Sequence, residues 1–344
     1  MNDLHQPYLD EGEYIYAEKV DTVTVGSGDE RIQLNLFLSS EDIEVARVFW
    51  NNGLDSLDVD IDFQEGVFSQ IIDELNEQQY DFKIITIDGF GNKSLPFEIE
   101  GNVYGNNYRN TISNRTISTI KANKNNELVI NWSETVNPDL LYSTVSYTNQ
   151  DGEHVVDSVP STEFRTILEN YSSELKYNTG FKPDSTAIDI FYTENVVVNT
   201  DKIILDYEEW TIVDFSSQHG GNENSVQNVI DGNQNTRWHS LAGGSSYPHW
   251  VTIDLGGLVN FSTLEVLRST FDGGGDNRAP DKFRFEVSID GITWVDAGEF
   301  DFNRLINDPQ SYSIMLPEPV RFVKFTALEG PENNFVLGAI KLYK

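Results

Sequence analysis

The side chains that most often perform catalysis are absent from this sequence or lie far apart in it. There is no cysteine, and the five histidines show neither the H-x-x-x-H nor the H-E-x-x-H spacing by which two histidines hold a metal ion. The chain also lacks the G-x-S-x-G turn of serine hydrolases, the P-loop and the dinucleotide-binding glycine pattern. Its 56 Asp and Glu residues offer many pairs for glycoside hydrolysis, but no pattern places two of them in one cleft. We therefore expect a protein that is not an enzyme.

The charge of the chain restricts its partners. The formal net charge is -33, which repels the phosphates of nucleic acids and the headgroups of anionic lipids. Solubility explains such an excess of carboxylates, and a surface that attracts calcium is the alternative. No run approaches the roughly 18 apolar residues of a membrane-spanning helix. No signal peptide is visible; a chain trimmed after a signal or a lipid-anchor cysteine would start in this way, and so would a cytoplasmic protein.

Short stretches of alternating apolar residues, separated by Gly, Asn, Asp and Pro, recur along the chain and predict an all-β protein. The alternation is clearest in residues 31–38, whereas 68–76 favours a short helix or turn. A second block, from about 103 to 200, repeats the order of strand, tryptophan, strand and glycine turn. We interpret residues 8–106 and 107–203 as two tandem fibronectin type III/Ig-like sandwiches, with Trp50 and Trp132 in their cores.

Several short motifs in this N-terminal part are similar to an uncharacterised domain that precedes discoidin modules in exported lipoproteins of Bacteroidota. These motifs lie at residues 12–16, 49–51, 88–94, 103–105, 115, 182–183 and 187–189. The resemblance implies a location: the outer-membrane surface or the periplasm, with the signal peptide removed. Contact with the membrane would be made only by a lipid anchor that is not present in this chain. A neighbouring outer-membrane transporter or glycan-degrading enzymes are the partners that such a location implies.

The last third of the chain carries a denser series of motifs. Residues 228–240 match the segment A-x-D-G-n-x-x-T-x-W-H, and 250–256 match W-h-x-I-D-L-G. Residues 283–294 match f-x-v-x-v-S-x-D-G-x-x-W, and 321–325 match a-R-y-v-r-f. In this order the motifs resemble the discoidin, or coagulation factor 5/8 type C, family. The resemblance implies a jelly-roll β-sandwich over residues 205–344, with Trp238 and Trp294 in its core.

The same resemblance implies a ligand site on loops at one end of this sandwich. The members that favour galactose-type sugars use a histidine, an arginine, an asparagine and an aromatic residue there, which can bond an axial hydroxyl and cover the sugar ring. The corresponding residues here, followed by two substitute aromatic platforms, are His239, Arg268, Asn277, Phe335, Tyr247 and Phe271. Each of the first three could instead have a structural role. His239 could be a buried histidine whose hydrogen bonds are all made within the protein, Arg268 could pair with an acidic neighbour, and Asn277 could simply form a turn. Phe335 is the most telling, because an apolar ring in a polar loop tip is costly unless it is used.

A calcium site is the second feature that the resemblance implies. Its oxygen ligands would come from Asn228, Asp231, Asn233 and Thr236, and from an acidic residue near the last strand. Ligands of this kind suit Ca²⁺. Ala339 occupies the acidic position here, so the site lacks one carboxylate. The sequence leaves open whether structural calcium binds.

Taken together, these features predict a non-catalytic cell-surface protein whose C-terminal module binds an oligosaccharide or polysaccharide of the galactose type. The two N-terminal sandwiches would act as a spacer. The alternative is an adhesion or protein-interaction lipoprotein whose discoidin module contacts a protein partner. The first hypothesis requires the loop residues named above to contact a sugar, and the second does not.

Overall fold

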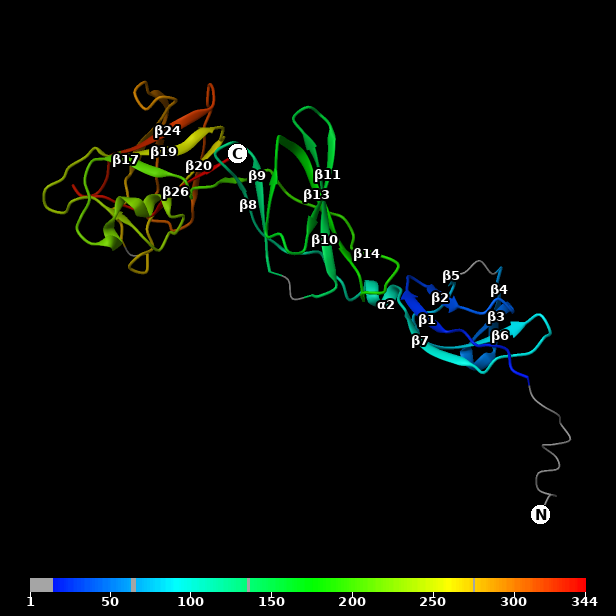
Figure 1. Ribbon diagram of the computed structural model, residues 1–344. Coiled ribbons are helices and arrows are strands. Elements are labelled where there is room, and N and C mark those ends of the chain that lie inside the picture. The colour runs from blue at the N-terminus through cyan, green and yellow to red at the C-terminus, as the bar shows by residue number, and fades with distance from the viewer. Residues whose placement is uncertain (1–14, 63–65, 135–136, 275) are drawn as a thin grey trace, which may run out of the picture. The chain divides into compact units, whose positions relative to one another are not determined.

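The structure is a computed structural model that describes residues 15–62, 66–134, 137–274 and 276–344 (Figure 1). Its regular secondary structure is almost all β-strand, as the apolar pattern predicted. Its residues form two compact units. Unit 1 comprises Met1–Arg115, Thr135–Thr144 and Asn178–Val196, and unit 2 comprises Thr116–Glu134, Val145–Tyr177 and Val197–Lys344. Among the described residues, no helix is both long and apolar enough to cross a membrane.

Unit 1 contains two antiparallel sheets, with the strand orders β1-β2-β5 and β4-β3-β6-β7. The elements are β1 (Thr22–Ser27), β2 (Ile32–Leu38), β3 (Ile43–Trp50), η1 (Asn51–Gly53), β4 (Asp55–Asp60), β5 (Gly66–Ile72), β6 (Gln78–Asp88), β7 (Phe97–Val103) and α2 (Asn106–Arg109). Ile32, Leu34 and Leu36 are fully buried. Because alternate side chains of a strand point to opposite faces, this row of β2 forms one wall of the core.

The helix or turn favoured for residues 68–76 is wrong. Residues 66–72 form β5, which pairs with β2 and places Phe68 opposite Leu36. Exposure alternates along β5, with Phe68 half-buried against the core and Ile72 buried. Without β5, the backbone N–H and C=O groups on one edge of β2 would have no strand to pair with. Pairing as a strand also turns the apolar residues of this segment toward the core, so it is favoured over a short amphipathic helix.

The following strands are β8 (Ile117–Ala122), β9 (Leu128–Trp132), β10 (Leu140–Asn149), β11 (His154–Pro160), β12 (Arg165–Leu168), β13 (Tyr171–Phe181), β14 (Phe191–Tyr192) and β15 (Val196–Val197). One sheet has the order β11-β10-β13-β14, with β15 beside β13. Trp132 is 4% exposed, which confirms its predicted core position, whereas Trp50 in unit 1 is only half-buried. The division into residues 8–106, 107–203 and 205–344 stays a prediction.

The C-terminal module begins with β16 (Ile204–Leu205) and β17 (Thr211–Phe215). Its later elements are η2 (Asn222–Asn224), η3 (Val226–Ile230), β18 (Trp238–His239), β19 (His249–Val259), β20 (Thr263–Leu267), β21 (Lys282–Ser288), β22 (Val295–Asp301), β23 (Gln310–Ser313), β24 (Val320–Glu329), β25 (Val336–Leu337) and β26 (Ala339–Tyr343). Strands β17-β19-β24-β21-β22 form one sheet. Phe283 of this sheet stacks on Phe325, with ring centroids 4.8 Å apart, and meets Tyr312 of β23 edge-on. These aromatic contacts join the two layers of the sandwich.

The two tryptophans predicted in this core differ. Trp238 is completely buried, but Trp294 is only half-buried. The carboxylate of Asp290 accepts the backbone N–H groups of Ile292 and Thr293, which shapes the turn after β21. Trp294 then lies near Lys324, whose Nζ is 5.9 Å from its ring centroid. The core position predicted for Trp294 is therefore wrong: the ring is partly exposed and lies beside the ammonium of Lys324.

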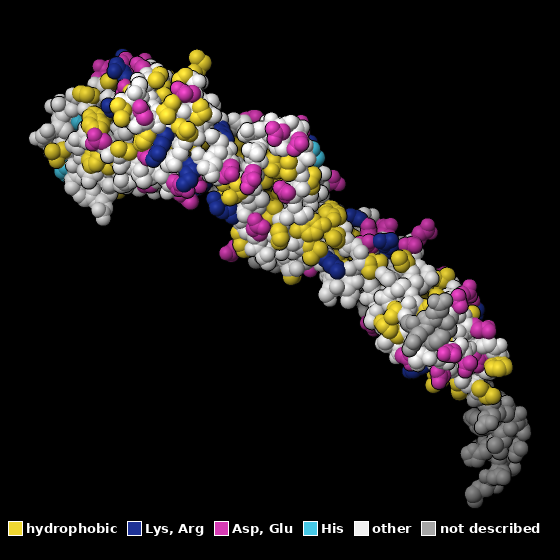
Figure 2. All heavy atoms as spheres, turned by 45° about the horizontal axis from the view of Figure 1, so that its top comes forward, with side chains coloured by type: hydrophobic (Ala, Val, Ile, Leu, Met, Phe, Trp, Pro, Cys, Tyr) yellow, Lys and Arg dark blue, Asp and Glu magenta, His cyan; other side chains and the backbone are white. Residues whose placement is uncertain are grey.

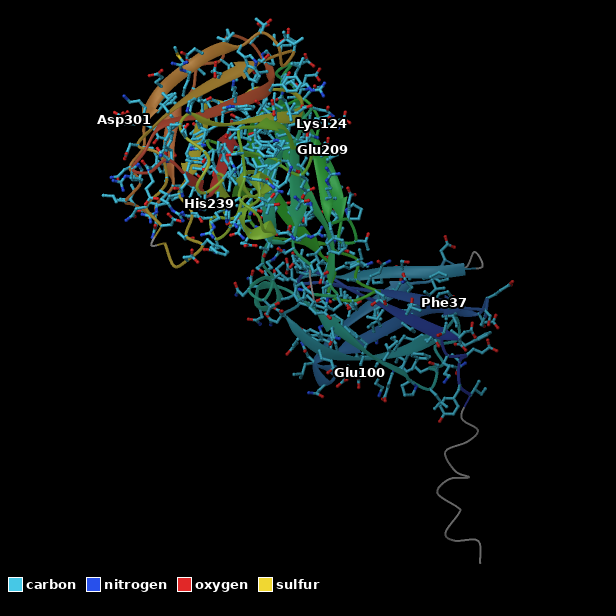
Figure 3. All side chains as sticks on the ribbon, turned by 90° about the vertical axis from the view of Figure 1, so that its left-hand side faces the viewer. Phe37, Glu100, Lys124, Glu209, His239 and Asp301 are labelled. Atoms are coloured by element: carbon cyan, nitrogen blue, oxygen red, sulfur yellow. The ribbon has the colours of Figure 1, made fainter. Side chains whose placement is uncertain are left out.

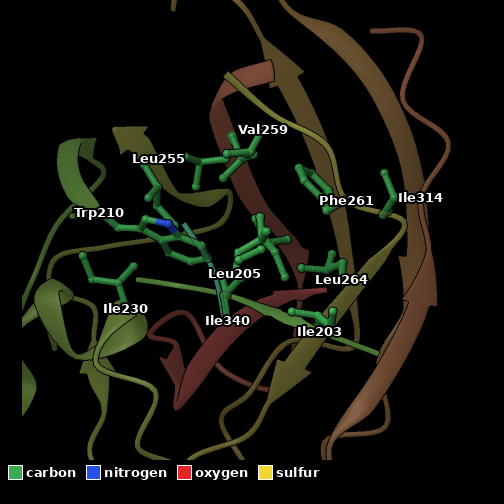
Figure 4. Packing of buried hydrophobic residues seen from close by; sticks show 14 of the residues in the cluster. Ile203, Leu205, Trp210, Ile230, Leu255, Val259, Phe261, Leu264, Ile314 and Ile340 are labelled. Atoms are coloured by element: carbon green, nitrogen blue, oxygen red, sulfur yellow. The ribbon is translucent and has the colours of Figure 1, made fainter. Parts of the chain in front are cut away.

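Strand β16 connects two parts of unit 2 in one sheet, with the order β12-β9-β8-β16-β26-β20-β23. It is parallel to β8 and antiparallel to β26. Leu205 of β16 is buried in the same apolar cluster as Trp210 and Ile340 (Figure 4). Lys124 and Glu209 add an ion pair (Figure 3). The C-terminal module therefore shares backbone hydrogen bonds and core with β8, and its binding is best measured in the full chain.

Candidate functional site

The loops at one end of the C-terminal sandwich are tied together by backbone hydrogen bonds. β18 pairs with β25, so that His239 lies opposite Val336. The N–H of Val336 also donates to the carbonyl of Arg278, at 3.0 Å. Three loops, around residues 239, 278 and 336, are thereby held in place by the rigid sheets beneath them.

A pocket of about 470 Å³ opens among these loops, a volume within the usual range of ~300–1,000 Å³ for small-molecule sites. Its walls are formed by Asp272, Asp276, Asn277, Arg278, Arg304, Pro331 and Glu332. Carboxylates, guanidinium groups and an amide line it together. A ligand with hydroxyl groups suits such a wall, because each hydroxyl both donates and accepts hydrogen bonds.

Arg278 and Asp276 form a bidentate ion pair in the wall of the pocket. Nε of Arg278 donates to Oδ1 of Asp276 at 2.8 Å, and Nη2 donates to Oδ2 at 2.5 Å. The side chain of Asp276 is 10% exposed and that of Arg278 is 27% exposed. Burial would raise the pKa of Asp276, but the hydrogen bonds and positive charge of Arg278 outweigh it, so the pKa is lowered. The pair stays charged and fixes the plane of the guanidinium.

A second arginine extends this network away from the pocket. Arg237 donates from Nε to the side chain of Asn224 and from Nη1 to Asp272, both at 2.8 Å. Its Nη1 is also 3.9 Å from Oδ2 of Asp276. The guanidinium carbon lies 4.4 Å from the ring centroid of Phe271. Arg237 thus covers one face of Phe271 and interacts with Asp272 and Asp276, two acidic residues that line the pocket.

His239, labelled in Figure 3, contacts Arg278. Its Nε2 is 2.7 Å from Nη1 of Arg278, and its Nδ1 is 2.5 Å from the carbonyl of Ser240. A guanidinium can only donate, so Nε2 accepts and Nδ1 carries the proton. Burial, together with the charges of Arg278 and Arg237, lowers the pKa of His239 although the Ser240 carbonyl raises it. The imidazole is 4% exposed and therefore positions Arg278.

Arg268, the arginine predicted to contact a ligand, is 3% exposed. Its Nη2 donates to the carbonyl oxygens of Gly274 and Asp276. The buried guanidinium consequently pins the glycine-rich loop from inside. The arginine that faces the pocket is Arg278, and a direct ligand contact by Arg268 does not fit its burial.

The exposed stacking role predicted for Phe335 is wrong. Its ring is fully buried and lies 4.9 Å from Trp238, 5.6 Å from His249 and 6.4 Å from Phe325 between centroids. Its backbone N–H and carbonyl bond to Ser240, which draws the loop inward. The polar residues around it in the sequence lie at the surface while Phe335 closes the end of the core.

The other predicted ligand residues lie at the edge of the pocket or beside it. Asn277 is exposed and lines the pocket, and its carbonyl accepts a hydrogen bond from Arg304 at 3.3 Å. Phe271 is half-buried next to Asp272. Tyr247 is half-buried, and burial followed by the charge of Asp281 raises its pKa. Asn277 is thus the predicted residue with the most direct access, and a ligand contact by any of them stays a prediction.

The residues predicted to bind calcium are only partly brought together. The hydroxyl of Thr236 lies 2.7 Å from Oδ2 of Asp231 and 2.7 Å from the carbonyl of Asn233. The amide nitrogen of Asn228 donates to three backbone carbonyls instead, among them that of Arg237. Ala339 is fully buried in β26. The oxygens of Asp231, Asn233 and Thr236 fit a hard cation, but they provide a single carboxylate.

The sequence interpretation missed most of the pocket wall. Asp276, Arg278, Arg304 and Glu332 of the wall were not singled out, nor was Arg237, which contacts Asp272 from outside it. A usable signal exists in the loop that contains Asn277, where residues of opposite charge stand two positions apart around it. On this acidic chain, whose carboxylates are spread over the face shown in Figure 2, an arginine so close to an aspartate favours a fixed ion pair.

Comparison with known families identifies both parts of the chain. A domain of unknown function, DUF4998, matches residues 1–191, more than half of the sequence, and the chain belongs to this family. The F5/8 type C domain matches residues 212–339. The predicted discoidin-type module and the predicted uncharacterised N-terminal domain are both confirmed.

Among curated proteins, the chain is similar to a sialidase of Micromonospora viridifaciens, with 34% identity over 104 residues, or 28% of this chain. It is also similar to a galactose oxidase of Gibberella zeae, with 28% identity over 125 residues, or 35% of this chain. The matches cover only 16% and 17% of those proteins.

Two solved structures are also similar to part of the chain. The C-terminal domain of a chitobiase from Bacteroides fragilis is 26% identical, with a TM-score of 0.37, covering 40% of this chain and 95% of that one. The family 32 carbohydrate-binding module of NanJ from Clostridium perfringens, solved with galactose, is 20% identical, with a TM-score of 0.36. That match covers 42% of this chain and 99% of the module.

Proposed function

We propose that this protein binds carbohydrate, without catalysis, in the loop pocket of its F5/8 type C domain. The observation that carries the proposal is the bidentate Arg278–Asp276 pair, backed by neutral His239, in a pocket that also exposes the amide of Asn277. The donors and acceptors are fixed before a ligand arrives, so little side-chain entropy is lost on binding. Sugar hydroxyls can bond to both charges of the pair at its open edge.

A galactose-type sugar is the first ligand to test. Asn277 supports this choice, because it lines the pocket and corresponds to a residue that the galactose-binding members use. Because Phe335 is buried, we assign the stacking role to Phe271, which is half-buried and adjoins the pocket residue Asp272 in the sequence. The ring would take the apolar face of the sugar while the Arg278 side of the pocket takes its hydroxyls.

The test is a glycan array followed by calorimetry on the full chain, with and without calcium. Arg278→Gln and Asn277→Ala should each weaken binding about tenfold, since each removes one or two hydrogen bonds to the ligand. Arg284→Gln is the matched control, because Arg284 also donates twice to one carboxylate, that of Glu299, on the outer face of the sheet. An array on which no oligosaccharide binds would refute the proposal. The same loss of sugar affinity in the Arg284→Gln control would also refute it.

The same variants separate carbohydrate binding from the adhesion hypothesis. If the module contacts a protein partner through another surface, Arg278→Gln leaves that contact intact. We further propose that the DUF4998 part holds the module away from the cell as a spacer on an exported lipoprotein. The resemblance of its sequence motifs to a domain of such lipoproteins supports this. Protease treatment of intact cells should then remove the module; protection of the chain until lysis would contradict the surface location.

We also propose weak calcium binding at Asp231, Asn233 and Thr236. Three oxygens converge there, the Thr236 hydroxyl and the Asp231 carboxylate and Asn233 carbonyl oxygens that it contacts, and this supports the proposal. A bound ion would hold the loop that leads into Trp238 and His239, and it would take no part in chemistry.

A further inference from the structure

The outer face of the sheet β17-β19-β24-β21-β22 carries two tryptophans close to one lysine. Val251 and Phe325, the neighbours of Trp250 and Lys324 along their strands, are fully buried, so Trp250 and Lys324 point away from the core. The Nζ of Lys324 lies 5.2 Å from the ring centroid of Trp250 and 5.9 Å from that of Trp294. Because both rings approach one ammonium, the three side chains share this outer face. We call Trp250, Lys324 and Trp294 the indole face.

Lys324 differs from the neighbouring cations of this sheet in having no acidic partner. Lys282, Arg284 and Arg321 each form an ion pair with a carboxylate. Glu286 of β21 lies directly opposite Lys324 of β24 in the antiparallel register. In the part of the chain that the structure describes, Lys324 nevertheless forms no ion pair or side-chain hydrogen bond. Its ammonium lies against the two indole rings instead, and its three N–H donors remain available to another group.

The two indoles of this face also have hydrogen-bonding capacity to spare. Trp132 and Trp238 in the core donate their Nε1–H to an oxygen acceptor at 2.9 Å. Within the described residues Trp250 and Trp294 have no such acceptor, and neither nitrogen is sealed from solvent. One ring would be enough to cover the apolar stem of a lysine. Two partly exposed indoles with open N–H groups beside an unpaired ammonium indicate a surface that binds a ligand.

We propose that the indole face binds a neutral, linear oligosaccharide, with one sugar ring against each indole and Lys324 donating to a hydroxyl between them. The two distances from Lys324 limit the separation of the rings to a span that a short oligosaccharide covers. The C–H groups of a sugar pack on aromatic faces, and its hydroxyls accept from the ammonium and from the indole N–H groups.

The surrounding charges restrict this ligand. Glu286 lies opposite Asp296 of β22, so two carboxylates stand beside the ammonium of Lys324. They disfavour a uronate or sulfated chain. An acidic peptide is the other ligand that an unpaired ammonium could attract, and the same two carboxylates oppose it. This site is independent of the function proposed for the loop pocket.

The experiment reads both tryptophans of the indole face in the full chain. The sequence has six tryptophans, so 5-fluorotryptophan labelling gives six ¹⁹F resonances, which single Trp→Phe variants assign. The labelled chain carries Arg278→Gln, which weakens binding in the loop pocket. Neutral xylo-, manno-, cello- and galacto-oligosaccharides from monosaccharide to hexasaccharide, their uronate and sulfated counterparts, and oligoglutamate are then titrated.

A neutral oligosaccharide should shift the Trp250 and Trp294 resonances together, with one midpoint, and should leave those of Trp50 and Trp132 in place. The hexasaccharide should bind about tenfold more tightly than the monosaccharide, because only the longer chain reaches both rings.

Trp294→Ala should weaken binding of the hexasaccharide about tenfold, and Lys324→Met should weaken it severalfold. Methionine keeps the apolar stem, so Lys324→Met should keep its fold even if Trp294→Ala does not. Lys341→Met is the matched control, because Lys341 is also a half-buried lysine but lies on β26 of the other sheet.

The inference would be overturned if every neutral sugar left both resonances unmoved, or if a monosaccharide bound as tightly as its hexasaccharide. A stronger response to the uronates or to oligoglutamate, or an equal loss of affinity in Lys341→Met, would also overturn it. None of these results bears on the loop pocket, whose ligand is measured in a Trp294→Ala chain with Arg278 intact. Absence of binding there, with Trp250 and Trp294 responsive in the Arg278→Gln chain, would refute the function proposed for the pocket and leave this inference standing.

Discussion

The loop pocket and the indole face differ in how their charged groups are held. In the pocket, Arg278 is fixed by Asp276 and His239, and both partners are largely buried. On the indole face, Lys324 lies opposite Glu286 but forms no ion pair with it or with any other described residue. The first surface is organised before binding and the second is organised by its ligand. We therefore expect substitutions in the pocket to change stability and binding together, whereas substitutions of the charged residues at the indole face should change binding alone.

The largest effect should come from the aromatic cluster behind the pocket. Phe335→Ala removes a completely buried ring between Trp238 and His249 and should destabilise unit 2 by about 3–5 kcal/mol. Phe335→Leu retains most of the volume and should cost under about 1.5 kcal/mol while sugar binding persists. Urea unfolding of the full chain, followed at the ¹⁹F resonances of Trp238 and Trp50, would measure both. A stable Phe335→Leu chain that has lost its sugar would restore the platform role for Phe335.

The second prediction concerns the ion pair itself. Asp276→Asn removes the negative charge that faces Arg278, so the side chain at position 276 fixes the guanidinium less firmly. Because the pair is partly exposed, we expect a loss of about 1–3 kcal/mol, below the value for a fully buried pair. Calorimetry should also show weaker sugar binding.

Glu286→Gln beside the indole face provides the contrast to Asp276→Asn. It should change the free energy of unfolding by less than about 0.5 kcal/mol, as is usual for partly exposed positions without an ion pair. Equal destabilisation by the two variants would contradict the view that the pocket is organised before its ligand binds and the indole face is not.

The sequence was sufficient for the all-β fold class, for the C-terminal module and for part of the pocket. The alternation of Ile32, Leu34 and Leu36 predicts β2, because burial on one face of a strand is a local property. The motifs around Trp238 and residues 250–256 identify the C-terminal module, because turns and core positions recur in that family.

What the sequence could not supply was the direction of individual side chains on the loops. Phe335 follows two asparagines and looks exposed, but its bonds to Ser240, 95 positions earlier, turn it inward. Arg268 and Arg278 are equally plausible in the sequence, and only the path of the glycine-rich loop decides which one faces outward. Long-range contacts of this kind leave no mark on local residue patterns.

The third prediction uses pH to separate the units. Burial lowers the pKa of His239 and of His249 below the ordinary value of 6.5. The unfolded chain therefore binds more protons than the folded chain below that value, so stability that is complete above pH 6.5 declines as the pH falls. Protonation of His239 also removes the acceptor that faces Arg278. Unit 1 has no histidine among its described residues. We expect mild acid to weaken unit 2 and its sugar binding first.

Urea unfolding between pH 7.5 and 5.5, read at Trp238 and Trp50, would measure this difference. His154→Gln is the matched control, because His154 is exposed at the start of β11 and its loss should leave the pH dependence unchanged. A parallel decline of both resonances, or a stability of unit 2 that is flat down to pH 5.5, would show that the two buried histidines do not set it.

The smallest effect should be that of calcium on unit 2. With a single carboxylate, from Asp231, we expect a dissociation constant near 1 mM, at the weak end of extracellular calcium modules, ~10⁻⁴–10⁻³ M. Calcium at that concentration would stabilise the folded state by about 0.4 kcal/mol, the value of RT ln 2. The unfolding transition read at the Trp238 resonance should show this stabilisation, and the transition read at Trp50 should not. A chelator should reverse the effect.

Asp231→Asn should abolish the calcium effect. Asp290→Asn is the control, because Asp290 also accepts backbone N–H groups and hydroxyls in an exposed turn. What distinguishes Asp231 is the backbone carbonyl of Asn233 that shares the Thr236 hydroxyl with it. Sensitivity to Asp290 instead, or no calcium response with Asp231 intact, would show that the loop is held by hydrogen bonds alone.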